Sequence, residues 1–259
     1  MTERTPVIAG NWKMELSHKA ATEVTGSLKK LLQDVPVSCD VVVCPSFPSL
    51  PAVAEELVNN KKIQIGAQNV HWEEKGAWTG EVSVAQIHPF VKWCIVGHSE
   101  RRRLVGETDE QVQQKAALLQ RHGITPIVCI GETQEEREQE RTVEKITQQV
   151  GSLISGLTRV AIAKLVVAYE PIWAIGTGIT PDPNEAAETM LLVRKLIAER
   201  FDQEIAERLR ILYGGSVNAE NVQPFVSEPG VDGVLVGSAS LRPLEFVNII
   251  KAVQSEHAK

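Results

Sequence analysis

Short, uniformly apolar segments recur along the whole chain. Eight of them are rich in Val, Ile and Leu, namely Val7–Gly10, Asp40–Cys44, Ile63–Ala67, Trp93–Gly97, Thr125–Cys129, Leu165–Tyr169, Arg210–Tyr213 and Gly233–Gly237. Strands that are apolar at every position, rather than at every second position, are typical of parallel sheets covered on both faces. The pattern therefore predicts eight buried parallel strands.

The segments between these strands show helical spacing. Apolar stripes run along Ala20, Ala21, Val24, Leu28, Leu31 and Leu32, and along Ala187, Met190, Leu191, Arg194, Ile197 and Ala198, and a last helix is expected over Leu244–Val253. Consecutive strands begin about 32 residues apart, the size of one strand-and-helix unit. Eight such units predict an α/β fold, a closed (β/α)8 TIM barrel of eight parallel strands ringed by helices. No linker divides residues 1–259, so a single domain is expected.

The composition is that of an ordinary globular protein. Of 259 residues, 43% are hydrophobic and 23% charged, with a mean hydropathy of −0.09. The net charge of −6 disfavours nucleic acids and acidic membranes as partners. The four cysteines, Cys39, Cys44, Cys94 and Cys129, form no Cys-x-x-Cys pair and are expected to be reduced thiols, which argues against zinc and redox sites.

Several other classes also lose support. The longest apolar run, Leu165–Tyr169, is far shorter than the ~20 residues that a membrane-spanning helix needs. Residues 1–10 offer no secretory core, so a cytoplasmic location is expected. Gly176-Thr-Gly178 is followed by Pro181 rather than a third glycine, and no Gly-Lys-Ser/Thr phosphate loop occurs. No nucleotide cofactor and no metal is expected.

Polar residues follow several of the predicted strands. In a parallel barrel the carboxyl ends of the strands meet at one mouth, so these side chains would face a common ligand. Asn11 and Lys13 follow the first strand and would point the same way from an extended backbone. The alternative is a solvated lysine at the start of a helix.

His98 follows the fourth strand, and a helix is expected to begin behind it. The positive end of a helix disfavours imidazolium, so a neutral ring that donates a hydrogen bond is expected. A histidine satisfied within the core is the alternative. His98-Ser-Glu100 also matches the His-x-Glu of zinc deaminases, but no Pro-Cys-x-x-Cys accompanies it. Glu100 and Arg101–Arg103 are interpreted as an ion-paired frame for the turn.

Glu170 follows the sixth strand and precedes an apolar loop of eight residues, Pro171, Ile172, Trp173, Ala174, Ile175, Gly176, Thr177 and Gly178. If this loop is a mobile lid that excludes water, burial raises the proton affinity of Glu170 and makes it a base for carbon acids. The alternative is a surface loop with an exposed glutamate. The apolar side chains of the loop favour the lid.

Two turns of small residues, Tyr213-Gly-Gly-Ser216 and Gly237-Ser-Ala-Ser240, follow the last two strands. Barrels often bind phosphate at these loops, through backbone amides. Close packing of glycines is the alternative. Neither turn contains Lys or Arg, so the positive charge would come from Lys13.

Together these motifs closely resemble one family, triosephosphate isomerase, over essentially the whole chain. The matching segments are Gly10-Asn-Trp-Lys-Met14, Gly66-Ala-Gln-Asn69, Trp78-Thr-Gly-Glu81, Gly97-His-Ser-Glu-Arg-Arg102, Cys129-Ile-Gly-Glu132, Tyr169-Glu-Pro-Ile-Trp-Ala-Ile-Gly-Thr-Gly178, Tyr213-Gly-Gly-Ser-Val217 and Leu235-Val-Gly237. The resemblance implies interconversion of dihydroxyacetone phosphate and D-glyceraldehyde 3-phosphate, in glycolysis and gluconeogenesis, without cofactor or metal.

The resemblance also implies a role for each residue at the mouth. Glu170 would move a proton between two adjacent carbons, and His98 would donate a proton to, and recover one from, the carbonyl and hydroxyl oxygens. Asn11 and Lys13 would stabilise the enediolate. Gly176, Ser216, Gly237 and Ser238 would hold the phosphate. Ser99, Glu100 and Cys129 would support the reacting groups from behind.

The segment Asn69–Ser83 resembles the loop that family members insert beside a neighbouring subunit's first catalytic loop. A homodimer is implied, with Thr79 reaching the partner's site; a loop packed on its own barrel is the alternative. Three places depart from the commonest family pattern: Ser238 in the phosphate turn, the segment Ile179-Thr180-Pro181 after the lid, and Glu15. Competing interpretations are another sugar-phosphate enzyme, such as an aldolase, or a catalytically silent barrel.

Overall fold

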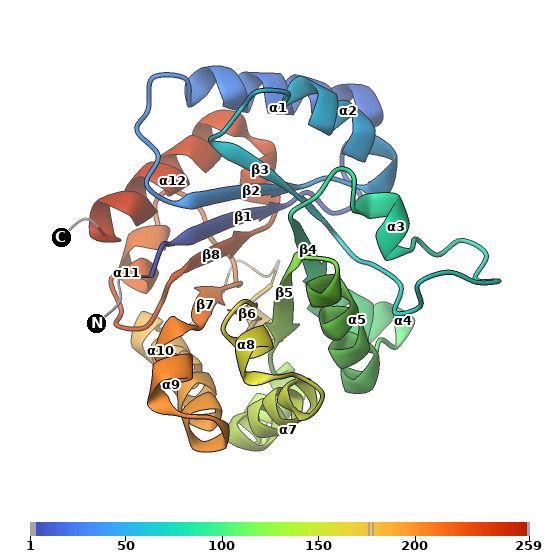
Figure 1. The fold of residues 1–259 in the computed structure, drawn as a ribbon. Helices are drawn as coiled ribbons and strands as arrows, with labels where there is room; N and C mark the ends of the chain where they lie inside the picture. Colours follow the sequence, from blue (N-terminus) through green and yellow to red (C-terminus); the bar gives the residue numbers. More distant parts are fainter. Residues whose placement is uncertain (1–3, 176, 178, 258–259) are drawn as a thin grey trace.

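The computed structural model describes residues 4–175, 177 and 179–257. Eight strands form a closed, fully parallel barrel in the order of the sequence (Figure 1). They are β1 (Val7–Asn11), β2 (Asp40–Cys44), β3 (Ile63–Ala67), β4 (Trp93–Val96), β5 (Thr125–Ile130), β6 (Val166–Tyr169), β7 (Arg210–Tyr213) and β8 (Gly233–Val236). The predicted fold is confirmed, and no strand boundary differs from its prediction by more than one residue. That residues 1–259 form a single domain stays a prediction.

Helices surround the barrel (Figure 1). The α-helices are α1 (His18–Leu31), α2 (Leu50–Glu56), α3 (Val84–Ile87), α4 (Ser99–Val105), α5 (Asp109–Arg121), α6 (Gln134–Glu138), α7 (Thr142–Ser155), α8 (Arg159–Ile162), α9 (Pro183–Arg200), α10 (Gln203–Arg208), α11 (Val222–Val226) and α12 (Pro243–His257). Short 3-10 helices are η1 (Phe47–Ser49), η2 (Ile172–Ala174) and η3 (Ser238–Leu241). Among the described residues, no helix is long and apolar enough to cross a membrane.

The strands are buried on both faces, which explains their uniformly apolar pattern. One face fills the barrel with Val7, Ala9, Val42, Cys44, Trp93, Ile95, Ile127, Cys129, Val166, Ala168, Leu212 and Leu235. The other face packs against the surrounding helices. The four cysteines are free thiols; Cys44, Cys94 and Cys129 are buried, and burial raises the pKa of each. Burial also raises the pKa of the half-buried Cys39, to about 12.

Helix α9 corrects one detail of the predicted stripe. Its buried residues are Ala186, Ala187, Met190, Val193 and Ile197, while Leu191 is 46% exposed. Residues three and four apart share a helix face, so Leu191, adjacent to Met190, is turned about 100° away from the buried stripe. Arg194 lies close to the barrel because its guanidinium binds Asp232 at 3.0 Å.

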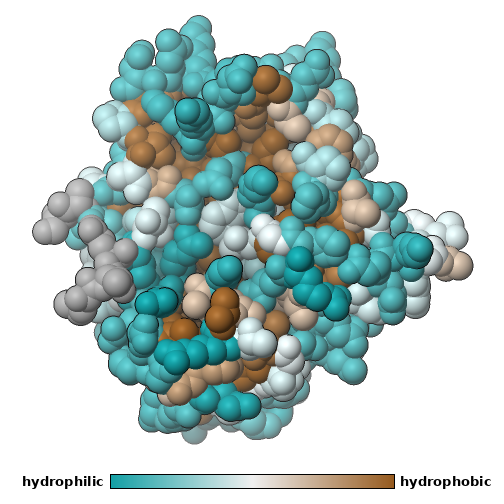
Figure 2. Space-filling view, viewed as in Figure 1, coloured by the Kyte–Doolittle hydropathy of each residue, from teal (hydrophilic) through white to brown (hydrophobic). Residues whose placement is uncertain are grey.

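The segment between β3 and α3 projects from the barrel, to the right of the molecule in Figure 1 and again in the space-filling view of Figure 2. Residues 73–80 are exposed, and Trp78 keeps 47% of its surface accessible. The rings of His71 and Trp72 stack at 4.1 Å between centroids, and Trp78 lies 4.5 Å from His71. The loop therefore holds an ordered aromatic cluster at its base and presents its tip, including Thr79, away from its own barrel.

Candidate active site

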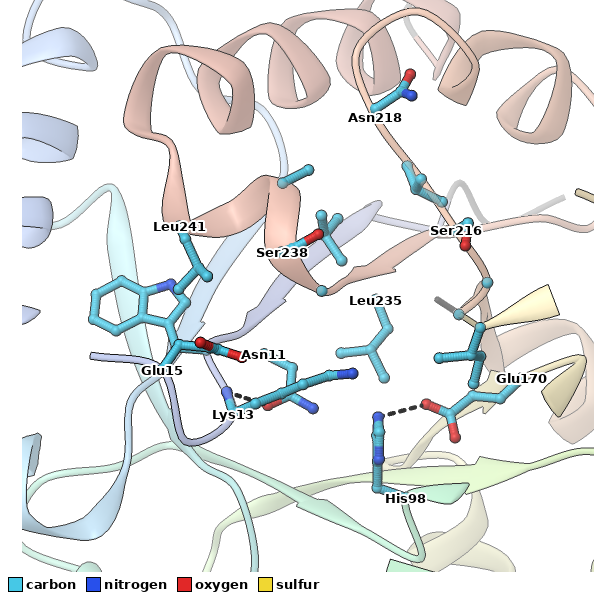
Figure 3. A pocket seen from close by; sticks show the side chains of 18 of the residues that line it. Asn11, Lys13, Glu15, His98, Glu170, Ser216, Asn218, Leu235, Ser238 and Leu241 are labelled. Carbon is cyan, nitrogen blue, oxygen red and sulfur yellow. Dashed lines mark hydrogen bonds and ion pairs between the residues drawn. The ribbon is translucent and has the colours of Figure 1, made fainter. Parts of the chain in front are cut away.

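A cavity of about 400 Å³ opens at the carboxyl ends of the strands. It is lined by residues that follow five different strands, among them Asn11, Lys13, His98, Glu170, Ser216, Gly237 and Ser238. The side chains of Lys13, His98 and Glu170 point into it from different sides (Figure 3). The barrel topology thus brings together residues that lie up to 231 positions apart in the sequence, Asn11 and Arg242.

Glu170 is only 2% exposed and is held by two neighbours from the turn after β4. One carboxylate oxygen lies 3.0 Å from His98 Nε2 (Figure 3), and the other accepts the backbone N–H of Ser99 at 2.9 Å. Burial alone would raise the pKa of Glu170, but His98 and Ser99 outweigh it and the pKa is lowered. In the ligand-free site two donors therefore stabilise the charge of this carboxylate, and the higher proton affinity expected under a closed lid stays a prediction.

His98 begins helix α4 as its N-cap. Its Nδ1 accepts the backbone N–H of Glu100 at 3.3 Å, so in that arrangement Nε2 carries the proton and donates to Glu170. Burial lowers the pKa of His98, but the Glu170 carboxylate outweighs burial and the pKa is raised. Burial and the neighbouring carboxylates thus shift the pKa of the imidazole in opposite directions, and in the ligand-free site the carboxylates, above all Glu170, have the larger combined effect.

Lys13 reaches the cavity from a turn rather than from extended backbone. Its φ is +48°, and its N–H is accepted by the Asn11 side chain at 3.1 Å. Gln68 closes the turn by donating to the carbonyls of Lys13 and Cys44, both at 2.8 Å. The prediction of extended backbone is therefore wrong at Lys13; side-chain contacts, and not strand alternation, hold Lys13 beside Asn11 at the cavity. Lys13 Nζ lies 2.5 Å from Glu100 Oε1.

The first half of the predicted lid is anchored at both sides of the mouth. The Trp173 indole donates to Glu132 at 2.8 Å, and the Tyr169 hydroxyl donates to the same carboxylate at 3.1 Å. The Ser216 hydroxyl donates to the carbonyl of Ala174 at 2.8 Å. Burial raises the pKa of Glu132. Ile175 lines the cavity, whereas Gly176 and Gly178 lie outside the described residues.

The two small-residue turns line the cavity opposite His98. A Cβ at Gly215 would lie 2.1 Å from the Tyr213 hydroxyl, so this turn requires glycine for close packing. The Ser240 hydroxyl donates to the carbonyl of Gly237 at 2.7 Å and fixes the second turn. The φ of Ser238 is not positive, so serine at this position carries no backbone strain.

Several residues with a place at the site had been given no role from the sequence. Glu132 and Gln68 hold the lid and the Lys13 turn, and both stand inside the quoted motifs just after β5 and β3. Asn218 and Arg242 line the outer cavity but follow no strand directly, so no sequence signal marked them. Cys129, which the sequence had placed near the reacting groups, contacts Glu170 from inside the barrel. In the described part of the chain, no three His, Cys, Asp or Glu side chains are grouped as a metal would need.

Comparison with known proteins agrees with this geometry. The family model described as triosephosphate isomerase matches residues 6–253. A triosephosphate isomerase of Clostridium perfringens is 44% identical over 248 residues, covering 95% of this chain and 99% of its own. One from Carboxydothermus hydrogenoformans is 46% identical over 252 residues, covering 96% and 98%. The family model matches residues 6–253, and Lys13, His98 and Glu170 lie together at the mouth of the barrel. The chain therefore belongs to the triosephosphate isomerase family.

Proposed function

We propose that this protein interconverts dihydroxyacetone phosphate and D-glyceraldehyde 3-phosphate in the cytoplasm, as a step of glycolysis and gluconeogenesis. The observation that carries the proposal is the buried Glu170 carboxylate, 3.0 Å from His98, in one cavity with the Lys13 ammonium and two small-residue turns. A base, a hydrogen-bond donor, a cation and a row of backbone amides are what aldose–ketose exchange on a phosphorylated triose requires.

In the proposed mechanism Glu170 removes a proton from the carbon beside the carbonyl, and the electron pair moves to the carbonyl oxygen. The resulting enediolate is stabilised by the Lys13 ammonium and the Asn11 amide. His98 Nε2–H donates to one oxygen and recovers a proton from the other. Glu170 then returns its proton to the neighbouring carbon, so that no atom is gained or lost and no cofactor is consumed.

Substrate binding changes the electrostatics of the pair. A substrate oxygen at His98 Nε2 takes the place of the Glu170 carboxylate, which removes the main cause of the raised pKa of His98. The ring is then neutral, as its position at the start of α4 favours. Glu170 in turn loses a donor while it stays buried, which raises its proton affinity at the moment when it acts as a base.

The phosphate group is proposed to bind to the amides of Gly176, Gly237 and Ser238 and to Ser216, with charge from Lys13. Amide dipoles in small-residue turns hold anions without large side chains. The Ser216 hydroxyl already joins its turn to the lid through Ala174. Phosphate that binds Ser216 would therefore change the contact between this turn and the lid. Closure of the lid over Glu170 would keep water away from the enediolate.

The active form is proposed to be a homodimer. The loop 69–83 exposes Trp78, and Met14, next to Lys13, is almost fully exposed. Apolar side chains at both places would be covered if the loop of one copy lay beside the Asn11–Lys13 turn of another, with Thr79 at that contact. The loop would then stabilise the strained backbone at Lys13 from outside.

A coupled assay with a nicotinamide-dependent dehydrogenase tests the reaction. Glu170→Asp moves the carboxylate back by one methylene, and a displacement of about 1 Å costs about 10²-fold in rate. Glu135→Asp makes the same change on exposed α6 and serves as a control with unchanged activity. Wild-type activity no higher than that of Glu170→Asp contradicts the proposal. Binding of inorganic phosphate without turnover would instead identify a catalytically silent barrel.

A further inference from the structure

We propose that Arg102 is a positioning residue that sets the distance between His98 and Glu170; this inference rests on the proposed function. Arg102 lies on α4, and its side chain is 14% exposed. Its Nε donates to the carbonyl of Gly97 at 2.7 Å and one terminal nitrogen to the carbonyl of Cys129 at 3.1 Å. The other terminal nitrogen pairs with Asp109 at 2.5 Å.

The two carbonyls belong to the ends of neighbouring strands. The parallel register of β4 and β5 ends at the pair Val96 and Val128, so Gly97 and Cys129 would form the next pair. The guanidinium binds both carbonyls at this point. Arg102 therefore continues the connection between the two strands where their backbone pairing stops. A planar fork of donors holds two acceptors in a fixed geometry, which a single ammonium does not do.

Each of these strand ends carries one side of the reacting pair. Gly97 directly precedes His98 and Ser99, the two donors to Glu170. Cys129 directly precedes Ile130, whose carbonyl accepts the backbone N–H of Glu170 at 2.7 Å. The position of Glu170 relative to its donors is thus set through the spacing that Arg102 maintains.

The backbone at Gly97 is shaped around the guanidinium. Its φ is +70°, and an added Cβ would lie 2.9 Å from a terminal nitrogen of Arg102. The chain turns here out of the strand and toward the cavity. Loss of Arg102 would leave the Gly97 carbonyl without this donor and would free the turn, so that His98 and Ser99 move together relative to Glu170.

Arg102→Gln and Arg102→Lys test the inference in the full-length protein. For Arg102→Gln we expect kcat to fall by about 10²-fold while KM changes by less than about threefold, since geometry and not binding is lost. Arg102→Lys keeps the charge beside Asp109 without the fork and should fall between Gln and wild type. Asp109→Asn removes the ion pair and leaves the carbonyl contacts, and should keep kcat close to wild type.

A second measurement does not depend on turnover. Titration of the His98 ring by NMR in the ligand-free protein should give a lower pKa in Arg102→Gln than in wild type, because the Glu170 carboxylate has moved away from Nε2. An inactive wild type would refute the proposed function, whereas an unchanged His98 titration would refute the role of Arg102.

Arg194→Gln is the matched control for stability. Arg194 is similarly buried at 11% exposure, and it also donates to backbone carbonyls, those of Ala206, Leu209 and Gly230, and pairs with Asp232. We expect a loss of Tm like that of Arg102→Gln, with wild-type kcat and His98 titration. If Arg102→Gln behaves like Arg194→Gln in all these measurements, or if Asp109→Asn lowers kcat as much as Arg102→Lys, the inference is wrong.

Discussion

The two ends of the barrel both hold buried charge, but they use it differently. At the amino end, Asp232 binds Arg4 at 2.6 Å, Arg194 at 3.0 Å and the backbone N–H of Ile211 at 2.8 Å. All of these partners belong to the protein itself. At the carboxyl end, Glu170 and His98 face a cavity, and each is the other's partner until a substrate comes between them.

The backbone conformation also differs between the two ends of the barrel. At the amino end Asp232, directly before β8, contacts Val7 in β1 and Ile211 in β7, so its contacts support regular strands. At the carboxyl end Lys13 is held at a φ of +48°. Strained backbone and replaceable partners are typical of functional sites, and complete pairing is typical of scaffolding. A substitution at the amino end should therefore cost stability, and one at the carboxyl end should cost activity.

The sharpest test of the carboxyl end is Glu170→Gln, which keeps the shape of the side chain and removes the base. We expect kcat to fall by about 10²–10⁴-fold, the usual contribution of a positioned base. The substituted protein should still fold and bind inorganic phosphate, because the phosphate turns are unchanged. Steady-state kinetics and phosphate inhibition measure both effects. Retained turnover would show that the base lies elsewhere.

The corresponding test of the amino end is Asp232→Ala. It leaves the guanidinium groups of Arg194 and Arg4 without their carboxylate, and breaking a buried ion pair costs about 3–5 kcal/mol of the free energy of unfolding. Urea unfolding measures the loss. The rate per folded molecule should equal that of wild type at a temperature where the variant is folded. A lower kcat would mean that the two ends are coupled.

A substitution in the projecting loop tests whether activity needs a second copy of the chain. Trp78→Arg places a charge on the exposed side of the aromatic cluster in this loop, and a central tryptophan contributes about 2 kcal/mol or more to an interface. We expect the dimer to dissociate at least tenfold more readily in analytical ultracentrifugation, with activity falling as the dimer is lost. Lys75→Arg, on the same exposed loop, is the control with no change. An active monomer would contradict the proposed assembly.

The pH dependence of the free energy of unfolding tests the charge of Glu170 at the carboxyl end. The pKa of Glu170 is lowered in the folded protein, from a usual value of 4.5, so its ionised form stabilises the fold above about pH 4.5. This stabilisation is lost as the pH falls through the folded-state pKa. Wild type should therefore lose stability more steeply than Glu170→Gln as the pH is lowered below 4.5. Equal slopes in urea unfolding would show that His98 and Ser99 do not stabilise the carboxylate.

The sequence predicted the barrel well because strands buried on both faces leave an unmistakable apolar pattern, as in Asp40–Cys44 and Arg210–Tyr213. It failed where a property depends on contacts between distant residues. The lowered pKa of Glu170 depends on His98 and on the N–H of Ser99, which lie 72 and 71 positions away. Glu132 had no visible role because its partners Tyr169 and Trp173 lie 37 and 41 positions later. The left-handed turn at Lys13 depends on Gln68 in the same way.

The smallest expected effect concerns Ser238, where the chain departs from the commonest family pattern. Its backbone is outside the positive-φ region, so Ser238→Gly should relieve no strain. Ser238→Ala removes only the hydroxyl, whereas Ser238→Gly also frees the unfolded chain at a cost of about 0.5–1 kcal/mol in stability. If the hydroxyl contacts phosphate, both variants should raise the inhibition constant of inorganic phosphate equally, by about tenfold, and leave kcat unchanged. If the glycine variant alone binds more weakly, backbone order rather than the hydroxyl holds the anion. Equal binding by all three proteins would show that the backbone amides suffice to hold the anion at the carboxyl end.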